Sequence, residues 1–256
     1  ASTGFAGDRS DERIERIASW IELPSALLDL DAGDTTIGHV DSTGKAPWGY
    51  MQDVADTEAG VLFIGTTGLV TLHNRTRGYG SSAAVDVSVS AEVIDPGVRL
   101  SSGIAGVVND ITVSRPGGAT VRVVDSVSVS TYGVLGEAID TIGDSDLDAL
   151  NRANWELATR STPVVKLPEL TLDGLTEPAS AADVRALDIG SRIEVTDLPA
   201  QAPESIADLR VQGYTERIGA GGWTVTANTT PYLAVTSLIL DDPVRGLLDS
   251  GNVLAY

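Results

Sequence analysis

The stretch LRVQGYTERIGAGGWTVTANTT, residues 209–230, shows most clearly what the second half of the chain builds. Apolar and polar residues alternate along both of its arms, and this period of two is typical of β-strands with one buried face. The glycine-rich connection at 219–222 separates the arms, and glycine adopts the positive φ angles of a tight reversal at little steric cost. The stretch therefore predicts a long β-hairpin.

Other short strands surround this hairpin. LTLDGL at 170–175 and SRIEVTDL at 191–198 show a similar strand pattern, and Gly, Pro and Asp separate the strands at intervals typical of small barrels or sandwiches. We therefore expect a β-barrel-like domain over 166–256, with the domain boundary between Ala158 and Leu170.

The first part of the chain, residues 1–165, mixes helical and strand-like patterns. Apolar residues recur at helical spacing in some segments and at every second position in others, which indicates a mixed α/β domain. The whole chain is therefore expected to be α+β and rich in β-structure. We expect helices near 10–22, 47–59 and 146–159, and hairpins at 61–74 and 107–125.

Each expected helix has recognisable ends. Pro24 ends the first, Pro47 opens the second at a position where proline is tolerated, and Ser145 is placed to cap the third. Their apolar stripes follow helical spacing. The expected stripes are Ile14, Ile17, Ala18 and Ile21 in the first helix, Met51, Val54 and Ala55 in the second, and Leu147, Leu150, Ala153 or Asn154, and Leu157 in the third.

The hairpins are predicted from their turns. Gly65-Thr66-Thr67-Gly68 and Arg115-Pro116-Gly117-Gly118 each lie between runs rich in β-branched residues, which favour strands. Between Val85 and Val93 the valines and Ala91 fall on one face, while Asp, Ser and Glu fall on the other. This alternation predicts another strand with one packed and one solvated face.

Charge and composition exclude several functions. The 256 residues include 36 acidic and 17 basic ones, for a net charge of −19, and the nearest approach to a basic cluster is Arg75 with Arg77. Binding a nucleic acid requires cations that displace counterions from phosphates, so we expect no specific nucleic-acid binding. No apolar run reaches the ~18 residues of a membrane span, and we expect neither a span nor an export signal. Because the chain lacks an initial Met, we expect it to be trimmed or part of a longer protein.

Three aspartates resemble the opening of a calcium loop. Asp144, Asp146 and Asp148 follow the D-x-D-x-D pattern, but the sixth position is Ala149 where glycine is needed, and the twelfth is Trp155 instead of glutamate. Acidic residues at a helix N-terminus, where they interact favourably with the helix dipole, explain the pattern better. Asp29, Asp31 and Asp34 are discounted as calcium ligands in the same way.

Residues suited to catalysis are few. The chain has no cysteine, and its only histidines, His39 and His73, lack a surrounding motif for nucleophilic or metal chemistry. The clusters Gly78-Tyr79-Gly80 and 219–222 have no following lysine, and the second lies between strands, unlike a phosphate-binding loop. Paired acids for glycoside hydrolysis stay open, because the fold sets their separation. We expect no enzymatic activity and assign no catalytic, cofactor-binding or metal-binding residue.

Two further patterns are interpreted as structural. Asn74-Arg75-Thr76 and Asn228-Thr229-Thr230 match the glycosylation pattern, but nothing in the sequence places the chain in a secretory pathway, so neither is assigned a role. The four tryptophans are scattered, and we expect them to anchor cores instead of forming a sugar-binding platform, which needs coplanar exposed rings. They are Trp20, Trp48, Trp155 and Trp223.

Six segments follow one another in a recognisable order: DVADTEAGVLFIGTTGLVTLHNRTR, VVNDITVSRPGGATVRVVDSVSVSTYG, ANWELATRSTPVVKLPELTL, ALDIGSRIEVTDLP, VQGYTERIGAGGWTVTANTTP and LDDPVRGLLDSGNVLAY. In this order they resemble siphophage tail-tip proteins, the baseplate hub or minor tail proteins of phages that infect actinobacteria. The resemblance extends from about Ile14 to Tyr256 and contains no catalytic signature.

The resemblance implies a virion structural protein at the tail tip, made in the host cytoplasm. It implies a hub-like β-barrel domain, a homo-oligomer, usually a trimer, and a position between the tail tube and the tip fibres or spike. Its expected neighbours are the distal tail, tape-measure and tip fibre or spike proteins, with no cofactor and no catalytic residues. An N-terminal β-domain usually precedes the first helix in this family.

Two alternatives stay open. A distal tail protein would form a hexameric ring, and a secreted carbohydrate-binding or adhesive module would use exposed tryptophans to contact cell-wall sugars. The high negative charge suggests a further hypothesis: acidic side chains that line a conduit would keep DNA from adhering during its passage.

Overall fold

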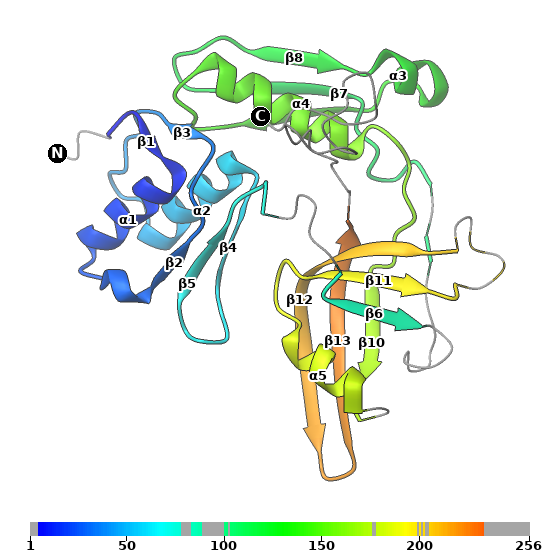
Figure 1. Ribbon diagram of the computed structural model, residues 1–256. Coiled ribbons are helices and arrows are strands. Elements are labelled where there is room, and N and C mark those ends of the chain that lie inside the picture. Colours follow the sequence, from blue (N-terminus) through cyan, green and yellow to red (C-terminus); the bar gives the residue numbers. More distant parts are fainter. Residues whose placement is uncertain are drawn as a thin grey trace, which may run out of the picture. The chain divides into compact units, whose positions relative to one another are not determined.

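The computed structural model describes residues 5–77, 83–88, 100–101, 103–175, 178–198, 200, 202 and 205–232, without the side chains of 178–180. The chain is α+β and rich in strands, as the sequence predicts (Figure 1). The described residues form two compact units, the first from 5–77 and 106–162 and the second from 83–105 and 163 onward. Among the described helices, none has the length and hydrophobicity of a transmembrane segment.

The first unit opens with two helices packed on a small sheet. The sheet has the order β2-β5-β4, with β2 parallel and β4 antiparallel to β5, and β1 pairs with β3 beside it. Ile14, Ile17, Val54 and Leu72 form the centre of this core. The elements are β1 (Asp8–Arg9), α1 (Ser10–Trp20), the 3-10 helix η1 (Ser25–Leu27), β2 (Leu28–Leu30), β3 (Thr36–Ile37), α2 (Pro47–Glu58), β4 (Val61–Ile64) and β5 (Val70–His73).

The rest of the first unit is a three-stranded sheet covered on one face by a helix. The sheet has the order β8-β7-β9, with β8 antiparallel and β9 parallel to β7. Ile111 and Val113 of the central strand pack against Ala149 and Ala153 of the covering helix α4. The elements are β7 (Asp110–Ser114), β8 (Val121–Val124), α3 (Ser126–Tyr132), β9 (Gly136–Asp140) and α4 (Asp146–Arg160).

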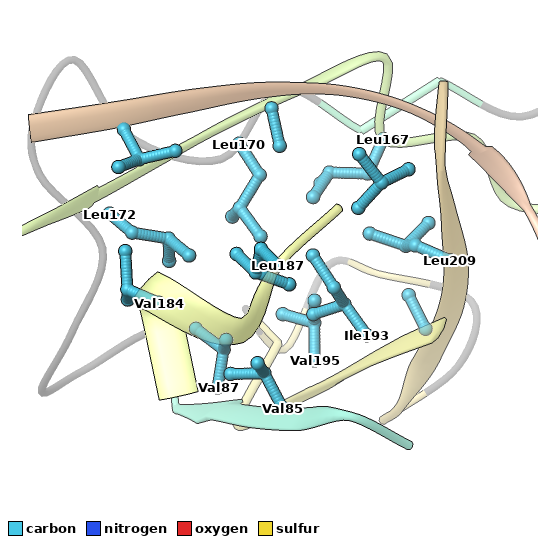
Figure 2. Close-up of a cluster of buried hydrophobic side chains, with 14 of the residues drawn as sticks. Val85, Val87, Leu167, Leu170, Leu172, Val184, Leu187, Ile193, Val195 and Leu209 are labelled. Carbon is cyan, nitrogen blue, oxygen red and sulfur yellow. The ribbon is translucent and has the colours of Figure 1, made fainter. Parts of the chain in front are cut away.

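The second unit is one five-stranded sheet with a helix on its inner side. The sheet has the order β10-β13-β12-β11-β6, and only the β11-β6 pair is parallel. Figure 2 shows Val184 of α5 and Leu187 just after it among buried side chains of the sheet. The elements are β6 (Val85–Ser88), β10 (Glu169–Asp173), α5 (Pro178–Ala186), β11 (Arg192–Thr196), β12 (Ala207–Gly219) and β13 (Gly222–Pro231).

The turns form where the sequence places them. Gly68 and Gly117 take φ angles of +81° and +71° in the first two hairpins, a region that favours glycine. The long hairpin also forms, with Gly219 opposite Gly222 and a bulge between Val211 and Gly213.

The buried face of α4 agrees with the expected stripe only in part. Ala153 is buried and Leu157 packs against the core, as predicted, whereas Leu147 and Leu150 are 62% and 38% exposed. Ala149 and Glu156, outside the predicted stripe, are also buried. The alanines allow close approach to the sheet, and the Glu156 carboxylate is buried because two arginines of the same helix neutralise it. In α1, likewise, the expected stripe ends early: the helix stops at Trp20, and Ile21 is exposed.

Two further differences concern the division of the chain. Strand β6, which we expected inside the 1–165 domain, pairs with β11 in the sheet of the second unit, and residues 89–93 of the predicted strand lie outside the described residues. The second part, predicted to consist almost wholly of strands, contains the helix α5. The pairing partner of β6 lies far along the chain, so local periodicity could not identify it.

Candidate assembly surfaces

Two of the three aspartates that resemble a calcium loop, Asp146 and Asp148, lie in the first turn of α4 and form hydrogen bonds within the chain. The Ser145 hydroxyl accepts a hydrogen bond from the backbone N–H of Asp148, and the Asp148 carboxylate accepts one from the backbone N–H of Ser145. Asp146 lies 2.6 Å from Nε of Arg115, and this hydrogen bond is the main reason why its pKa lies below the usual value. Nowhere in the described ranges do three or more His, Asp or Glu residues converge as a metal site.

The acidic loop after β2 anchors the segment that follows β5. Asp31 accepts a hydrogen bond from the backbone N–H of Asn74 and forms an ion pair of 2.6 Å with Arg77. The Thr76 hydroxyl donates to Asp34, and the Asn74 side chain donates to a backbone carbonyl of the loop. The first glycosylation-like triplet therefore holds two loops of the first unit together.

The two histidines lie in different settings. His39 is exposed after β3, whereas His73 is buried at the end of β5, where its ring meets the edge of Phe63 at a centroid distance of 4.9 Å. Gly78-Tyr79-Gly80 lies outside the described residues. The glycines at 219–222 lie at the tip of the β12-β13 hairpin, which is the turn that the sequence predicts.

The tryptophans are less buried than predicted. Trp223 is 8% exposed, lies in the core of the second unit and stacks under the guanidinium of Arg185 at 5.4 Å. Trp20 and Trp48 are 43% and 37% exposed, so they do not anchor a core, and Trp155 is partly buried. The expectation was therefore wrong for Trp20 and Trp48: each lies at an end of its helix, where the other elements leave it uncovered.

A cavity of about 490 Å³ lies in the first unit between α2 and the ends of β7 and β9. Asp53, Asp56 and Asp140 give it an acidic wall, and burial, reinforced by the charge of Asp53, raises the pKa of Asp56 against the opposing effect of Arg152. Its hydroxyl groups already have partners within the chain: Thr57 donates to a backbone carbonyl, and Ser114 donates to Asp140.

The outer face of the five-stranded sheet is polar. Side chains alternate across each strand, so the residues between the buried ones point away from the core. Arg192 and Asp208 pair across β11 and β12 at 2.9 Å, and the hydroxyls of Thr171 and Thr226 lie 3.1 Å apart on β10 and β13. This solvated face carries threonines and acidic residues together with Arg192, Arg210 and Arg217.

The sheets also end in strands with open edges. In the described part of the chain, β6 and β10 are the outermost strands of the five-stranded sheet, and β8 and β9 are those of the three-stranded one. An outer strand presents backbone N–H and C=O groups that another chain can use. The described residues therefore offer two kinds of surface for function: these strand edges and the polar face of the five-stranded sheet.

No family model and no curated protein matches the chain. Solved structures do match it. The 43 kDa tail protein of prophage MuSo2 from Shewanella oneidensis aligns with a TM-score of 0.56 at 14% identity, over 89% of this chain and 67% of its own. A tail protein from Neisseria meningitidis MC58 aligns with a TM-score of 0.58 at 11% identity, over 88% of this chain and 68% of its own.

A third structure extends the likeness to another bacterial group. The prophage tail protein gp18 from Listeria monocytogenes EGD-e aligns with a TM-score of 0.51 at 9% identity, over 91% of this chain and 69% of its own. Identities this low carry information about the fold alone. The chain thus shares its fold, across both units, with these three tail proteins.

Proposed function

We propose that the chain is a structural component of the tail of a long-tailed phage that infects actinobacteria, and that it acts as a hub subunit at the tail tip. The observation that carries the proposal is a fold shared with three tail proteins over about nine-tenths of the chain. The hub would join the tail tube to the tip fibres or spike.

The chain would act by assembly and without catalytic turnover. The residues that sequence patterns single out for chemistry serve the fold instead: the acids cap helices or form ion pairs, and His73 is buried against an aromatic ring. The open strand edges support assembly with further chains, because pairing satisfies their backbone groups. We expect a homotrimer that contacts the distal tail, tape-measure and tip fibre or spike proteins.

The charge supports a role in the DNA conduit. The net charge is −19, and on the polar face of the five-stranded sheet the acidic side chains outnumber the arginines. A channel wall of this kind repels phosphates, so DNA would slide without adhering. A density map of the assembled ring with a neutral or basic bore would contradict this role.

The mass of the native assembly tests the hub. The purified chain is measured by native mass spectrometry at increasing concentration, and virions are labelled with antibodies against it for electron microscopy. A trimer and label at the tail tip are expected. A hexamer would instead support the distal tail ring, and a monomer at high concentration together with unlabelled tails would contradict both. Release of fragments from actinobacterial cell walls would contradict the absence of catalysis.

A further inference from the structure

Strand β12 extends well beyond its neighbour on one side. β11 pairs with β12 only from Ala207 to Arg210, whereas β13 pairs with it as far as Gly219. Beyond the bulge at Val211, no strand in the described part of the chain borders this side of β12. Beyond the bulge, β12 therefore has one open edge, although it is a central strand where it pairs with β11. Figure 1 shows the β12-β13 hairpin continuing past the end of β10.

The backbone groups of three residues point out of this edge. The carbonyl of Trp223 accepts a hydrogen bond from Gly174 next to β10, so Trp223 faces β10 and the next residue, Thr224, faces β12. Thr224 lies opposite Arg217, and the direction alternates along the strand. The N–H and C=O groups of Tyr214, Glu216 and Ile218 therefore point away from β13. Outside the pairing of β12 with β13, none of them forms a backbone hydrogen bond with another described residue.

Along this edge an acidic side chain, Glu216, lies between two largely apolar ones, Tyr214 and Ile218. They lie opposite Ala227, Val225 and Trp223, which places them on the core side of the sheet. Ile218 is 77% exposed, an unusual position for a large apolar side chain on that side.

The acidic position has no cation in the described chain. Burial raises the pKa of Tyr214, and the negative charges of Asp188 and Glu216 raise it further, so both carboxylates lie near its hydroxyl. Neither carboxylate forms an ion pair with another described residue, although thirteen ion pairs occur elsewhere. Among the described residues the edge therefore lacks a neighbouring strand, and Glu216 lacks an ion-pair partner, although the guanidinium of Arg185 lies over Trp223 opposite Ile218.

We propose that the edge formed by Tyr214, Glu216 and Ile218 accepts an added β-strand from a different polypeptide, one with a basic residue between two apolar ones. The added backbone would satisfy the outward N–H and C=O groups, the basic side chain would lie beside Glu216, and the apolar ones would cover Tyr214 and Ile218. A second copy of the same edge fits less well: antiparallel pairing of all three residues would place two Glu216 carboxylates opposite each other. The edge would bind such a strand whether or not the protein belongs to a tail tip.

A labelled peptide tests the edge on the full chain. The probe is acetyl-Thr-Val-Thr-Lys-Thr-Val-Thr-amide with a fluorophore, and binding is followed by anisotropy up to about 1 mM, the weak end of specific affinities. Saturable binding is expected. Two further peptides carry N-methyl groups on one or the other set of alternate amides, so each cannot donate hydrogen bonds along one of its two edges. The peptide that is methylated on the edge facing β12 should not bind. Absence of saturation, or equal binding of both methylated forms and the parent, would overturn the proposal.

A charge exchange shows which side chain is recognised. Glu216→Lys should weaken binding of the lysine peptide by about five- to tenfold and strengthen binding of the peptide with glutamate at its centre. Thr215→Lys is the matched control, because the side chain of Thr215 lies on the opposite face, and it should change binding by less than about twofold. Circular dichroism establishes that both variants are folded. If both variants change binding equally, the added strand does not lie at this edge.

Discussion

At the scale of single residues, Asp8 ties the start of the chain to α1. Its carboxylate lies 3.0 Å from Nε of Arg13, which is fully buried, and 2.7 Å from Nε of Arg16. These contacts lower the pKa of Asp8; the hydrogen bond from Arg16 contributes most, and burial opposes it. Arg13 also donates to the Tyr50 hydroxyl at 2.7 Å, so one carboxylate orients a cation that joins α1 to α2.

This contact predicts a loss of stability in acid. A carboxyl group whose pKa is lower in the folded state stabilises the fold above its unfolded pKa, near 3.8, and this stabilisation disappears as the pH falls through the lower, folded value. Asp8→Asn should therefore reduce the free energy of unfolding at pH 7, and the difference from the parent should shrink below about pH 4. Urea unfolding at several pH values measures it. Glu15→Gln, at an exposed position outside the described ion pairs, serves as the control; an equal effect there would contradict a specific role of Asp8.

At the scale of elements, α4 tests which face of a helix determines stability. Ala153 is fully buried against the sheet, whereas Leu147 is mostly exposed. Ala153→Leu should lower the free energy of unfolding by about 1–3 kcal/mol through overpacking, and Leu147→Ala should change it by no more than about 0.5 kcal/mol. Urea unfolding compares both variants with the parent. A larger loss for Leu147→Ala would mean that the side of α4 that carries Leu147 is the packed one.

Local signals predicted most helices and hairpins, and pairing between distant segments could not be predicted in this way. Pro47, Ser145 and the glycine turns determine helix starts and chain reversals within a few residues, so the sequence alone shows where these occur. The segment SVSVSTY alternates like a strand yet forms α3, because the Asp125 side chain accepts hydrogen bonds from two N–H groups at its start. The open edge of β12 exists because β11 is short. The sequence of β12 itself contains no signal for the length of β11, so this edge could not be predicted from it.

At the scale of the whole molecule, each unit has its own buried cores, two in the first and one in the second, and should unfold by itself. Val225 lies in the core of the second unit and Ile14 in one of the two cores of the first. Burying an unpaired charge costs several kcal/mol, so Val225→Asp and Ile14→Asp should each lower the midpoint of a different thermal transition. Calorimetry records both. Thr230→Asp, on the exposed face of β13, is the control; a single transition that both core variants shift equally would contradict independent units.

Strand β6 also constrains how the protein is made. The ribosome releases β6 roughly 100 residues before β11, a delay on the order of 5–20 s at about 5–20 residues per second. In that interval its valines have no sheet to join, while residues 106–162 emerge and complete a different unit. Slow synthesis would keep this segment accessible to chaperones for longer, and cutting the gene anywhere between the two strands would separate partners that only the finished polypeptide brings together.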